Sequence, residues 1–264
     1  MKKIKKLRTQ TGAGMVDCKK ALDEANGDIE KATEILRKKG IAKAAKRGER
    51  DAVEGVIKAA VNDDKREGYI LEINAETDFV VRNEKFQDFS NQVLQIIKDK
   101  KPAGLDELLG LEMDGTTVKE TLDNLSGTIG EKISISRFDI LSGATVANYS
   151  HSNGKIGVLL ALDKADKDEL AYDLAMHTAA ADPRYLKPEE IKKEEINKEK
   201  EIYREQLKKE GKPEQIIDKI LVGKINKFYE EVCLLNQEYI KDDKKKVAEI
   251  LEGANIEKYI RYSL

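Results

Sequence analysis

The chain has 264 residues, which is long enough for two domains and a well-buried core. Charged residues make up 37 % of it and apolar residues 40 %. No apolar run approaches the roughly 20 residues that cross a bilayer, and no apolar segment follows the basic N-terminus, so we expect neither a membrane span nor a secretory signal. Two cysteines are too few for a disulfide framework, and we expect a reducing, cytoplasmic location.

The net charge of −2 conceals an uneven distribution. The first 50 residues hold fifteen Lys and Arg against seven Asp and Glu, whereas the rest of the chain holds 33 basic and 43 acidic side chains. A basic segment of this kind is typical of proteins that contact RNA, a membrane surface or an acidic protein face. Composition alone leaves these alternatives open.

Residues 1–42 predict a small module of three short helices. Gly12-Ala13-Gly14 turns the chain after the first helix, Asn26-Gly27 ends the second, and Asp28 can cap the third. Helical spacing predicts buried faces at Ile4 and Leu7, then Cys18, Ala21, Leu22 and Ala25, then Ile29, Ala32, Ile35 and Leu36. Residues 43–54 are charged and predict a helical or flexible linker.

Residues 55–140 predict an α+β unit with antiparallel strands. Strands are expected at 56–61 and 69–75, with a polar loop between them, and a further strand is expected at 133–138. Asn83 is a suitable N-cap for a helix after the second strand. The buried face of that helix would hold Phe86, Phe89, Val93, Ile96 and Ile97.

Residues 141–264 predict a second unit of the same kind. A strand at 146–150, a hairpin turn at Ser152-Asn153-Gly154 and a return strand at 156–162 precede a helix. One face of that helix would hold Leu170, Leu174, His177 and Ala181. Because hairpin and helix follow each other twice, with little sequence identity, we predict a diverged structural repeat.

The segment at about 187–232 has a different composition. Twelve basic and twelve acidic side chains fall within residues 187–231, a pattern typical of a solvent-exposed helix pair. Gly211-Lys212-Pro213 interrupts the run, so we predict an antiparallel helical hairpin that protrudes from the second unit. Beyond it, residues 245–251 predict a short helix and residues 259–262 predict an edge strand.

The sequence lacks the patterns of catalytic, nucleotide and metal sites. Gly12-Ala13-Gly14 lacks the third glycine of a dinucleotide site, and residues 127–132 fit no phosphate-binding loop, so both are expected to be turns. The two histidines and two cysteines show no metal-ligand spacing. His177 is expected in the core, whereas His151 suits a partner contact as well as a structural role. We therefore expect no enzyme activity, no cofactor and no binding of GTP.

Two apolar residues, Phe79 and Val80, lie in the connection between the strand at 69–75 and the following helix. Apolar side chains in such a connection have two explanations. They can cover the end of the local core, or they can project as a wedge that is offered to a partner. Position alone favours the first explanation.

Two long motifs resemble the elongation factor Ts family, whose members exchange nucleotide on the translational GTPase elongation factor Tu. The segment Asn74-Ala75-Glu76-Thr77-Asp78-Phe79-Val80 resembles the family signature, and residues 11–22, from Thr11 through Gly14-Met15-Val16 to Leu22, resemble a second family marker. Further similarity runs through Gly130-Glu131-Lys132, Ser150-His151 and Gly211-Lys212-Pro213, so the resemblance covers nearly the whole chain.

The resemblance implies a fold and a set of contact residues. The first three helices would form a module like a ubiquitin-associated domain, and the helical hairpin would match a coiled-coil insertion. In the family, the residues that match Thr77, Asp78, Phe79 and Val80 are associated with displacing Mg²⁺ from elongation factor Tu. Phe79 would be the wedge, and Asp78 would either hold the segment in shape or contact the partner backbone. Thr77 would organise the segment, and Val80 is the weakest candidate because it would also fit the core. Further partner contacts are expected at Met15, Lys19, Lys20, Asn83 and His151.

A module that binds RNA or the ribosome is the main alternative, because the first 50 residues are basic. It predicts an affinity that falls steeply with salt. Phe79, Tyr69 and Tyr149 are the aromatic residues expected to be free to stack on bases, and none lies in the basic segment. The expected partner is therefore elongation factor Tu, without nucleic acid or membrane, and a homodimer stays possible.

Overall fold

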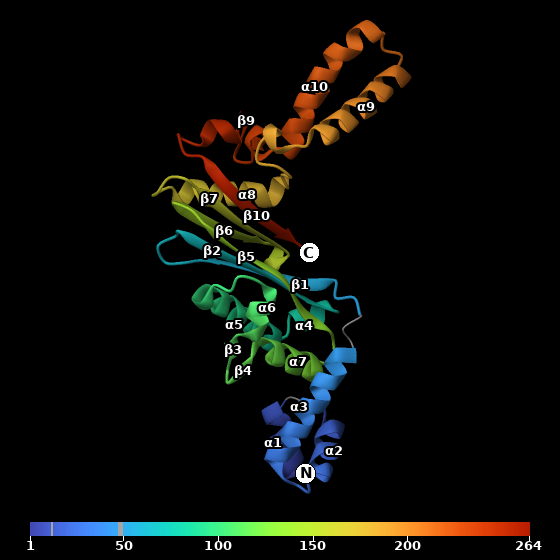
Figure 1. Ribbon diagram of the computed structural model, residues 1–264, viewed down its shortest axis with the longest axis vertical. Helices are drawn as coiled ribbons and strands as arrows, with labels where there is room; N and C mark the ends of the chain where they lie inside the picture. The colour runs from blue at the N-terminus through green and yellow to red at the C-terminus, as the bar shows by residue number, and fades with distance from the viewer. Residues whose placement is uncertain (12, 47–49) are drawn as a thin grey trace.

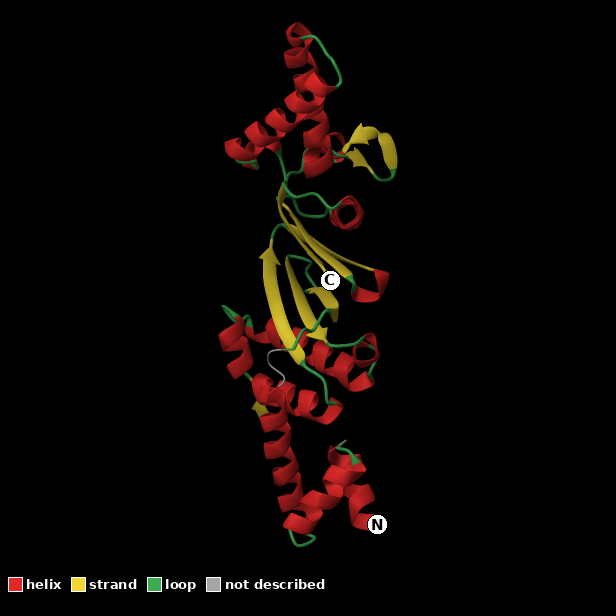
Figure 2. Ribbon diagram, turned by 90° about the vertical axis from the view of Figure 1, so that its right-hand side faces the viewer, coloured by secondary structure: helices red, strands yellow, loops and turns green. Residues whose placement is uncertain are grey.

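The computed structural model describes residues 1–11, 13–46 and 50–264. Gly12, within a predicted turn, and residues 47–49, within the predicted linker, lie outside the described residues. Figures 1 and 2 show an elongated molecule in which the N-terminal helices lie at one end, a helical hairpin lies at the opposite end, and the two three-stranded sheets lie between them.

The N-terminal module is built from α1 (Lys2–Thr11), α2 (Met15–Glu24) and α3 (Ile29–Lys46). Asp28 caps α3, because its Oδ1 accepts the backbone N–H groups of Glu30 and Lys31 at 3.0 and 3.1 Å. The helices meet through the side chains that helical spacing predicted, with Leu7, Cys18, Ala21, Leu22, Ala25 and Ala32 buried and Ile4, Ile29, Ile35 and Leu36 partly buried. Because α3 continues past residue 42, the first part of the predicted linker is helical.

The first sheet is antiparallel, with strand order β1 (Glu54–Val61), β2 (Glu67–Ala75), β5 (Ile133–Ser142). β2 is buried on both faces, since every residue from Gly68 to Ala75 is covered. Tyr69 is only 2 % exposed and donates a hydrogen bond to Glu67. The expectation that Tyr69 could stack on a base is therefore wrong, because the helix at residues 84–100 covers its side of β2.

Helices cover the outer face of the first sheet. They are α4 (Asp78–Val81), α5 (Glu84–Lys100), α6 (Leu105–Gly110) and α7 (Val118–Ile129), with a small hairpin of β3 (Glu112–Met113) and β4 (Thr116–Thr117) before α7. α5 begins where predicted, because Asn83 Oδ1 accepts the N–H of Lys85 at 3.0 Å. The turn predicted at 127–132 is wrong in its first half: α7 continues to Ile129 and ends at Gly130, whose φ is 93°.

Gly127 lies inside α7, at the place where α7 packs against α3. A Cβ atom added to Gly127 would lie 2.6 Å from the Cα of Gly40, which is closer than real side chains approach. An ion pair between Arg37 and Glu120, at 2.6 Å, joins the same two helices. The glycine that the sequence assigned to a turn is thus required by a contact between two helices.

The second sheet is also antiparallel and has the order β10 (Ile256–Ser263), β7 (Ile156–Leu162), β6 (Thr145–His151). A 3₁₀ turn (Ser152–Gly154) joins β6 to β7, and α8 (Asp168–Ala181) covers the outer face. In both units a hairpin leads into helix, and the last strand pairs with the second strand of the hairpin. The predicted repeat is therefore present in the topology, and β10 lies at the edge as expected.

The two sheets pack face to face. Ile57 and Ile70 of the first sheet meet Leu159 and Ile260 of the second in one buried cluster. Gly157 allows this close approach, since a Cβ atom there would lie 2.4 Å from Cγ2 of Ile57. The layers follow the order helices, sheet, sheet, helix along the long axis (Figure 1).

The helical hairpin consists of α9 (Lys193–Lys209) and α10 (Glu214–Val232), and it projects beyond the second sheet (Figure 1). Leu207, Ile217 and Leu221 are buried between the two helices, and Gly211 turns the chain with φ 73°. A short 3₁₀ turn at Pro188–Glu190 precedes α9. The segment after α10 contains a 3₁₀ turn (Leu234–Asn236), β8 (Glu238–Tyr239), β9 (Asp242–Lys246) and a further 3₁₀ turn (Val247–Ile250).

The helix predicted at 245–251 is wrong in type. Lys245 and Lys246 belong to β9, and only one 3₁₀ turn follows. Val247 is buried against the second core, so a tertiary contact fixes this short stretch more than helix propensity does.

His177 is a packed core residue, as predicted, with 1 % exposure. Its Nδ1 accepts the backbone N–H of Ile240 at 3.2 Å, so Nε2 carries the proton and donates to Gln237 Oε1 at 3.1 Å. Both ring nitrogens therefore have a partner that fits the neutral imidazole.

We predict that His177 makes the free energy of unfolding fall as the pH falls through about 6.5. Burial lowers the pKa of His177 below its ordinary value of 6.5, so the unfolded chain takes up a proton first and is favoured in acid. The slope from this residue is at most about 1.4 kcal/mol per pH unit. Urea unfolding at about pH 7.5 and about pH 5.5 measures the difference in the free energy of unfolding between these two pH values. His177→Gln should reduce the difference, and an equal pH dependence in that variant would contradict the prediction.

We predict that Gly127→Ala lowers the free energy of unfolding by about 1–3 kcal/mol, because the new Cβ meets the backbone of Gly40. Gly223→Ala in α10 is the matched control, since a Cβ there meets nothing within 4 Å. The control should be stabilised by up to about 1 kcal/mol through helix propensity. Urea unfolding of both variants provides the comparison, and stabilisation of both would show that the α3–α7 contact tolerates a side chain.

Candidate partner-binding surface

The segment between β2 and α5 is one turn of helix, α4, and not an irregular loop. Thr77 is its N-cap, and Thr77 Oγ1 accepts the backbone N–H of Val80 at 3.4 Å. The same hydroxyl lies 3.0 Å from both carboxylate oxygens of Glu131, to which it donates. Thr77 therefore faces the protein and shapes the turn.

Phe79 and Val80 are adjacent in α4 but have opposite surroundings. Val80 is 6 % exposed and belongs to the core beneath the first sheet, whereas Phe79 is 79 % exposed. The two explanations that the sequence left open thus apply to different residues: Val80 covers the core, and Phe79 projects. Burial of a Phe side chain is worth about 1.5–3 kcal/mol, so an exposed Phe79 is a strong candidate for a contact that a partner completes.

Asp78 is the first residue of α4, and Asn83 lies two residues beyond its end. Asp78 forms an ion pair with Arg82 at 2.8 Å, four residues further on, and both side chains are well exposed. Such an exposed pair contributes little stability, so it can open when a partner binds. Asn83 Oδ1 is already engaged by its cap of α5.

His151 lies at the end of β6 and is exposed. Its ring stacks with Tyr149 at a centroid distance of 6.0 Å, and the rings of Tyr149 and Tyr172 make a T-shaped contact at a centroid distance of 5.7 Å. Tyr172, on α8, is 49 % exposed and was not singled out from the sequence. The exposure of Tyr172 could have been predicted from the sequence, because this residue falls out of phase with the buried residues of α8.

The turn after His151 lies at the same end of the sandwich as α4. Lys155 Nζ pairs with Glu54 at 2.5 Å, and Glu54 opens β1 opposite Ala75, the last residue of β2 before α4. The structure thus brings residues 77–80 and the region of His151 to neighbouring edges of the sheets. The other three candidates lie on α2, in the N-terminal module.

Those three candidates, Met15, Lys19 and Lys20, lie on α2 and are exposed, Met15 to 48 %. The adjacent Val16 is 66 % exposed and was not selected from the sequence. Met15 and Val16 fall outside the buried phase of α2, so the first turn of this helix presents an apolar surface beside two lysines. This combination suits a protein partner with an acidic edge and an apolar depression.

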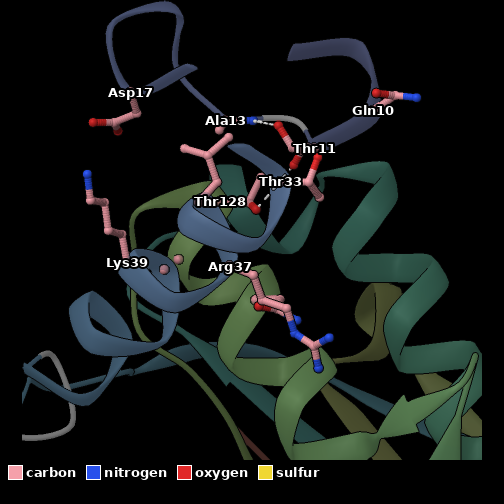
Figure 3. Close-up of a pocket in the computed structure, with 12 residues that line it drawn as sticks. Gln10, Thr11, Ala13, Asp17, Thr33, Arg37, Lys39 and Thr128 are labelled. Atoms are coloured by element: carbon pink, nitrogen blue, oxygen red, sulfur yellow. Dashed lines mark hydrogen bonds between the residues drawn. The ribbon is translucent and has the colours of Figure 1, made fainter. Parts of the chain in front are cut away.

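A groove of about 220 Å³ lies where the N-terminal module meets α7 (Figure 3). Thr11, Arg37, Lys39 and Thr128 are among its lining residues. The two cations already have partners, since Arg37 pairs with Glu120 and Lys39 pairs with Glu24 at 2.5 Å. Thr128 Oγ1 donates to the carbonyl of Thr11 at 3.5 Å, so the groove marks a junction between two parts of the fold.

Among the residues that the structure describes, no group of three or more His, Cys, Asp or Glu side chains could hold a metal ion. No helix within residues 1–11, 13–46 and 50–264 is long and apolar enough to cross a membrane. Both cysteines are buried thiols, and burial raises the pKa of Cys233 to about 11.

Comparison with known proteins gives a consistent result. A family model described as Elongation factor TS matches residues 76–264. Elongation factor Ts of Clostridium perfringens (strain 13) is 45 % identical over 258 residues, which cover 95 % of this chain and 85 % of the relative. Elongation factor Ts of Syntrophotalea carbinolica is 46 % identical over 279 residues, which cover 99 % of this chain and 91 % of the relative. Elongation factor Ts of Trichlorobacter lovleyi is 45 % identical over 264 residues, which cover 95 % of this chain and 85 % of the relative.

These matches, together with the α+β fold, identify a translation elongation factor. Within that class, the chain belongs to the elongation factor Ts family.

We predict that two adjacent alanine substitutions in α4 have different effects on stability. Val80→Ala removes buried methyl groups and should lower the free energy of unfolding by about 1–3 kcal/mol. Phe79→Ala should change it by less than about 0.5 kcal/mol, because the ring is exposed. Urea unfolding measures both variants. A large loss of stability in Phe79→Ala would mean that the ring packs against the protein in solution.

Proposed function

We propose that this protein binds elongation factor Tu in its GDP-bound form and accelerates GDP release by disturbing the Mg²⁺ and phosphate site. The product is a nucleotide-free complex, which then binds GTP. The observation that carries the proposal is Phe79, a large apolar side chain held almost fully exposed on a one-turn helix, within the segment that resembles the family signature.

Exchange of this kind requires no catalytic group on this chain. By linkage, a protein that binds its partner more weakly when nucleotide is present also weakens nucleotide binding by the same factor. Bound GDP depends on closely placed amides, charged groups and a metal ion with strict geometry. A small displacement of those groups therefore releases several strong contacts at once.

The four residues at the start of α4 have separate roles in this proposal. Phe79 inserts between helices of the GTPase and shifts the elements that hold Mg²⁺ and phosphate. Asp78 contacts the partner after its exposed ion pair with Arg82 opens. Thr77 and Val80 hold α4, the first through its hydrogen bonds and the second through its burial.

Phe79 alone cannot supply the energy for exchange. Burial of one Phe provides about 1.5–3 kcal/mol, whereas a rate gain of roughly 10⁴-fold requires about 5.5 kcal/mol. A broad interface must supply the rest. We propose that Met15, Lys19 and Lys20 on the N-terminal module contribute to it, together with Asn83 and His151.

The proposal also includes an organisation and a location. Residues 1–42 act as one contact module, residues 55–140 carry α4, and residues 141–264 provide the second contact region. Residues 43–54 connect the module to the first unit. The site of action is the cytoplasm, where thiols such as those of Cys18 and Cys233 stay reduced.

We predict that the intact protein accelerates release of fluorescent GDP from elongation factor Tu, and that Phe79→Ala reduces the acceleration roughly 10- to 150-fold. The assay chases bound fluorescent GDP with unlabelled nucleotide. Val222→Ala, which truncates a side chain that is 64 % exposed on α10, is the matched control and should exchange like the parent. If the intact protein gave no acceleration, the proposed function would be wrong. If Phe79→Ala kept full activity, the exchange would depend on another part of the interface.

A further inference from the structure

The segment Gly130-Glu131-Lys132 lies directly across from the residues that lead into α4. The ladder between β2 and β5 ends at the pair Ala75 and Ile133. Continued in the same register, Glu76 would face Lys132 and Thr77 would face Glu131. Backbone-to-backbone pairing of the two strands ends at this point.

Side chains continue the pairing where the backbone does not. Glu131 Oε2 accepts the backbone N–H of Thr77 at 3.1 Å, and Glu76 Oε1 accepts the backbone N–H of Lys132 at 2.6 Å. Each carboxylate thus binds the opposite backbone, which joins the two segments reciprocally. Hydrogen bonds to a charged acceptor are stronger than neutral ones, so this is a firm attachment for the start of α4.

The Glu131 carboxylate also orients the Thr77 hydroxyl. A hydroxyl has one proton to donate and lone pairs to accept with. Because the Thr77 proton points to Glu131 at 3.0 Å, a lone pair is directed to the N–H of Val80 at 3.4 Å. Without Glu131 the hydroxyl could rotate, and the first turn of α4 would lose its fixed cap.

Glu131 itself is attached to α7. Its backbone carbonyl accepts the Ser126 hydroxyl at 2.6 Å, immediately after the left-handed turn at Gly130. α7 in turn packs on α3 of the N-terminal module through Gly127 and Gly40. Glu131 therefore joins α4, which presents Phe79, to α7, on which the N-terminal module packs.

We propose that Glu131 is a positioning residue for nucleotide exchange: it fixes α4 through Thr77 so that Phe79 projects in one orientation. This inference rests on the proposed function, because its role is expressed through Phe79. Glu131 contacts neither nucleotide nor Mg²⁺ in this proposal.

We predict that Glu131→Ala lowers the maximal rate of GDP release from elongation factor Tu by about tenfold, because bonds to a charged acceptor are lost. The concentration that gives half-maximal rate should stay within about twofold, since the contact surface itself is intact. Glu107→Ala is the matched control. Glu107 also accepts a backbone N–H, that of Ala103 at 2.8 Å, but lies on α6, and its variant should exchange like the parent.

Two further variants separate positioning from general structural damage. Thr77→Val removes the hydroxyl and should behave like Glu131→Ala, whereas Thr77→Ser keeps the hydroxyl and should behave like the parent. In the Phe79→Ala background, Glu131→Ala should cause no additional loss, because its effect passes through Phe79. An undiminished loss in that background, or a full maximal rate in Glu131→Ala, would overturn the inference.

Hydrogen exchange in the absence of partner distinguishes this inference from the proposed function. The N–H groups of Val80 and Val81 bond to Thr77, so both should exchange faster in Glu131→Ala, while the amides of β2 stay protected. Unchanged exchange at Val80 and Val81 would overturn the positioning role even if GDP release is accelerated. If the parent protein did not accelerate release, the proposed function would fail, and with it any role of Glu131 in exchange.

Discussion

The central strand β2 has a protein layer on each side. On one side its residues Leu71 and Ile73 pack with Phe86 and Phe89 of α5, and on the other side Ile70 packs with Leu159 of the second sheet. Each such apolar side chain contributes about 1.5–3 kcal/mol when fully buried, so the strand is fixed in position and register. The end of β2 therefore has a fixed position, and so does the start of the segment that leads from Ala75 into α4.

The two units share a topology, and the comparison extends to the residues that end their middle strands. In the second unit β7 ends at Leu162 opposite Ile256, and the next residue, Asp163, accepts the backbone N–H of Asn255 at 2.7 Å. In the first unit Glu76 takes the same place after Ala75 and accepts the N–H of Lys132. Hydrogen bonds from Asn255 also lower the pKa of Asp163, which keeps that acceptor charged. An acidic residue thus ends the ladder in both halves.

The units differ in what comes after this acidic residue. In the second unit a short connection leads from Asp163 to α8, which begins at Asp168. In the first unit Thr77 and α4 are inserted before α5, and the contact between Thr77 and Glu131 is added. The hydrogen bond shared by both units serves the fold, whereas the added contact accompanies the exposed Phe79. This separation of a common structural feature from an added one supports the assignment of Glu131 to positioning.

Much of the fold could be predicted from periodicity alone, because burial and helical spacing are local signals. The three N-terminal helices, the two hairpins and the protruding helix pair follow from such patterns, and Asn83 follows from its place before an apolar helix. Gly127 could not be assigned correctly, since its reason is a contact with Gly40, 87 residues away in the chain. Tyr69 alternates with Leu71 and Ile73 along β2, so its burial beneath α5 was readable from the sequence, and the expectation that it could stack on a base was the error.

In the candidate site, too, contacts between residues far apart in the sequence could not be predicted. A helix of four residues has no period to read, so sequence pattern cannot decide which of Phe79 and Val80 turns inward; only the packing of α4 on the sheet separates them. Likewise, Gly130-Glu131-Lys132 is recognisable as a motif, but its use depends on the strand register that brings residue 131 opposite residue 77. Glycine at 130 permits the left-handed turn, and the turn directs Glu131 back to Thr77. The chemistry of the site thus depends less on any single side chain than on where the β2–β5 ladder stops.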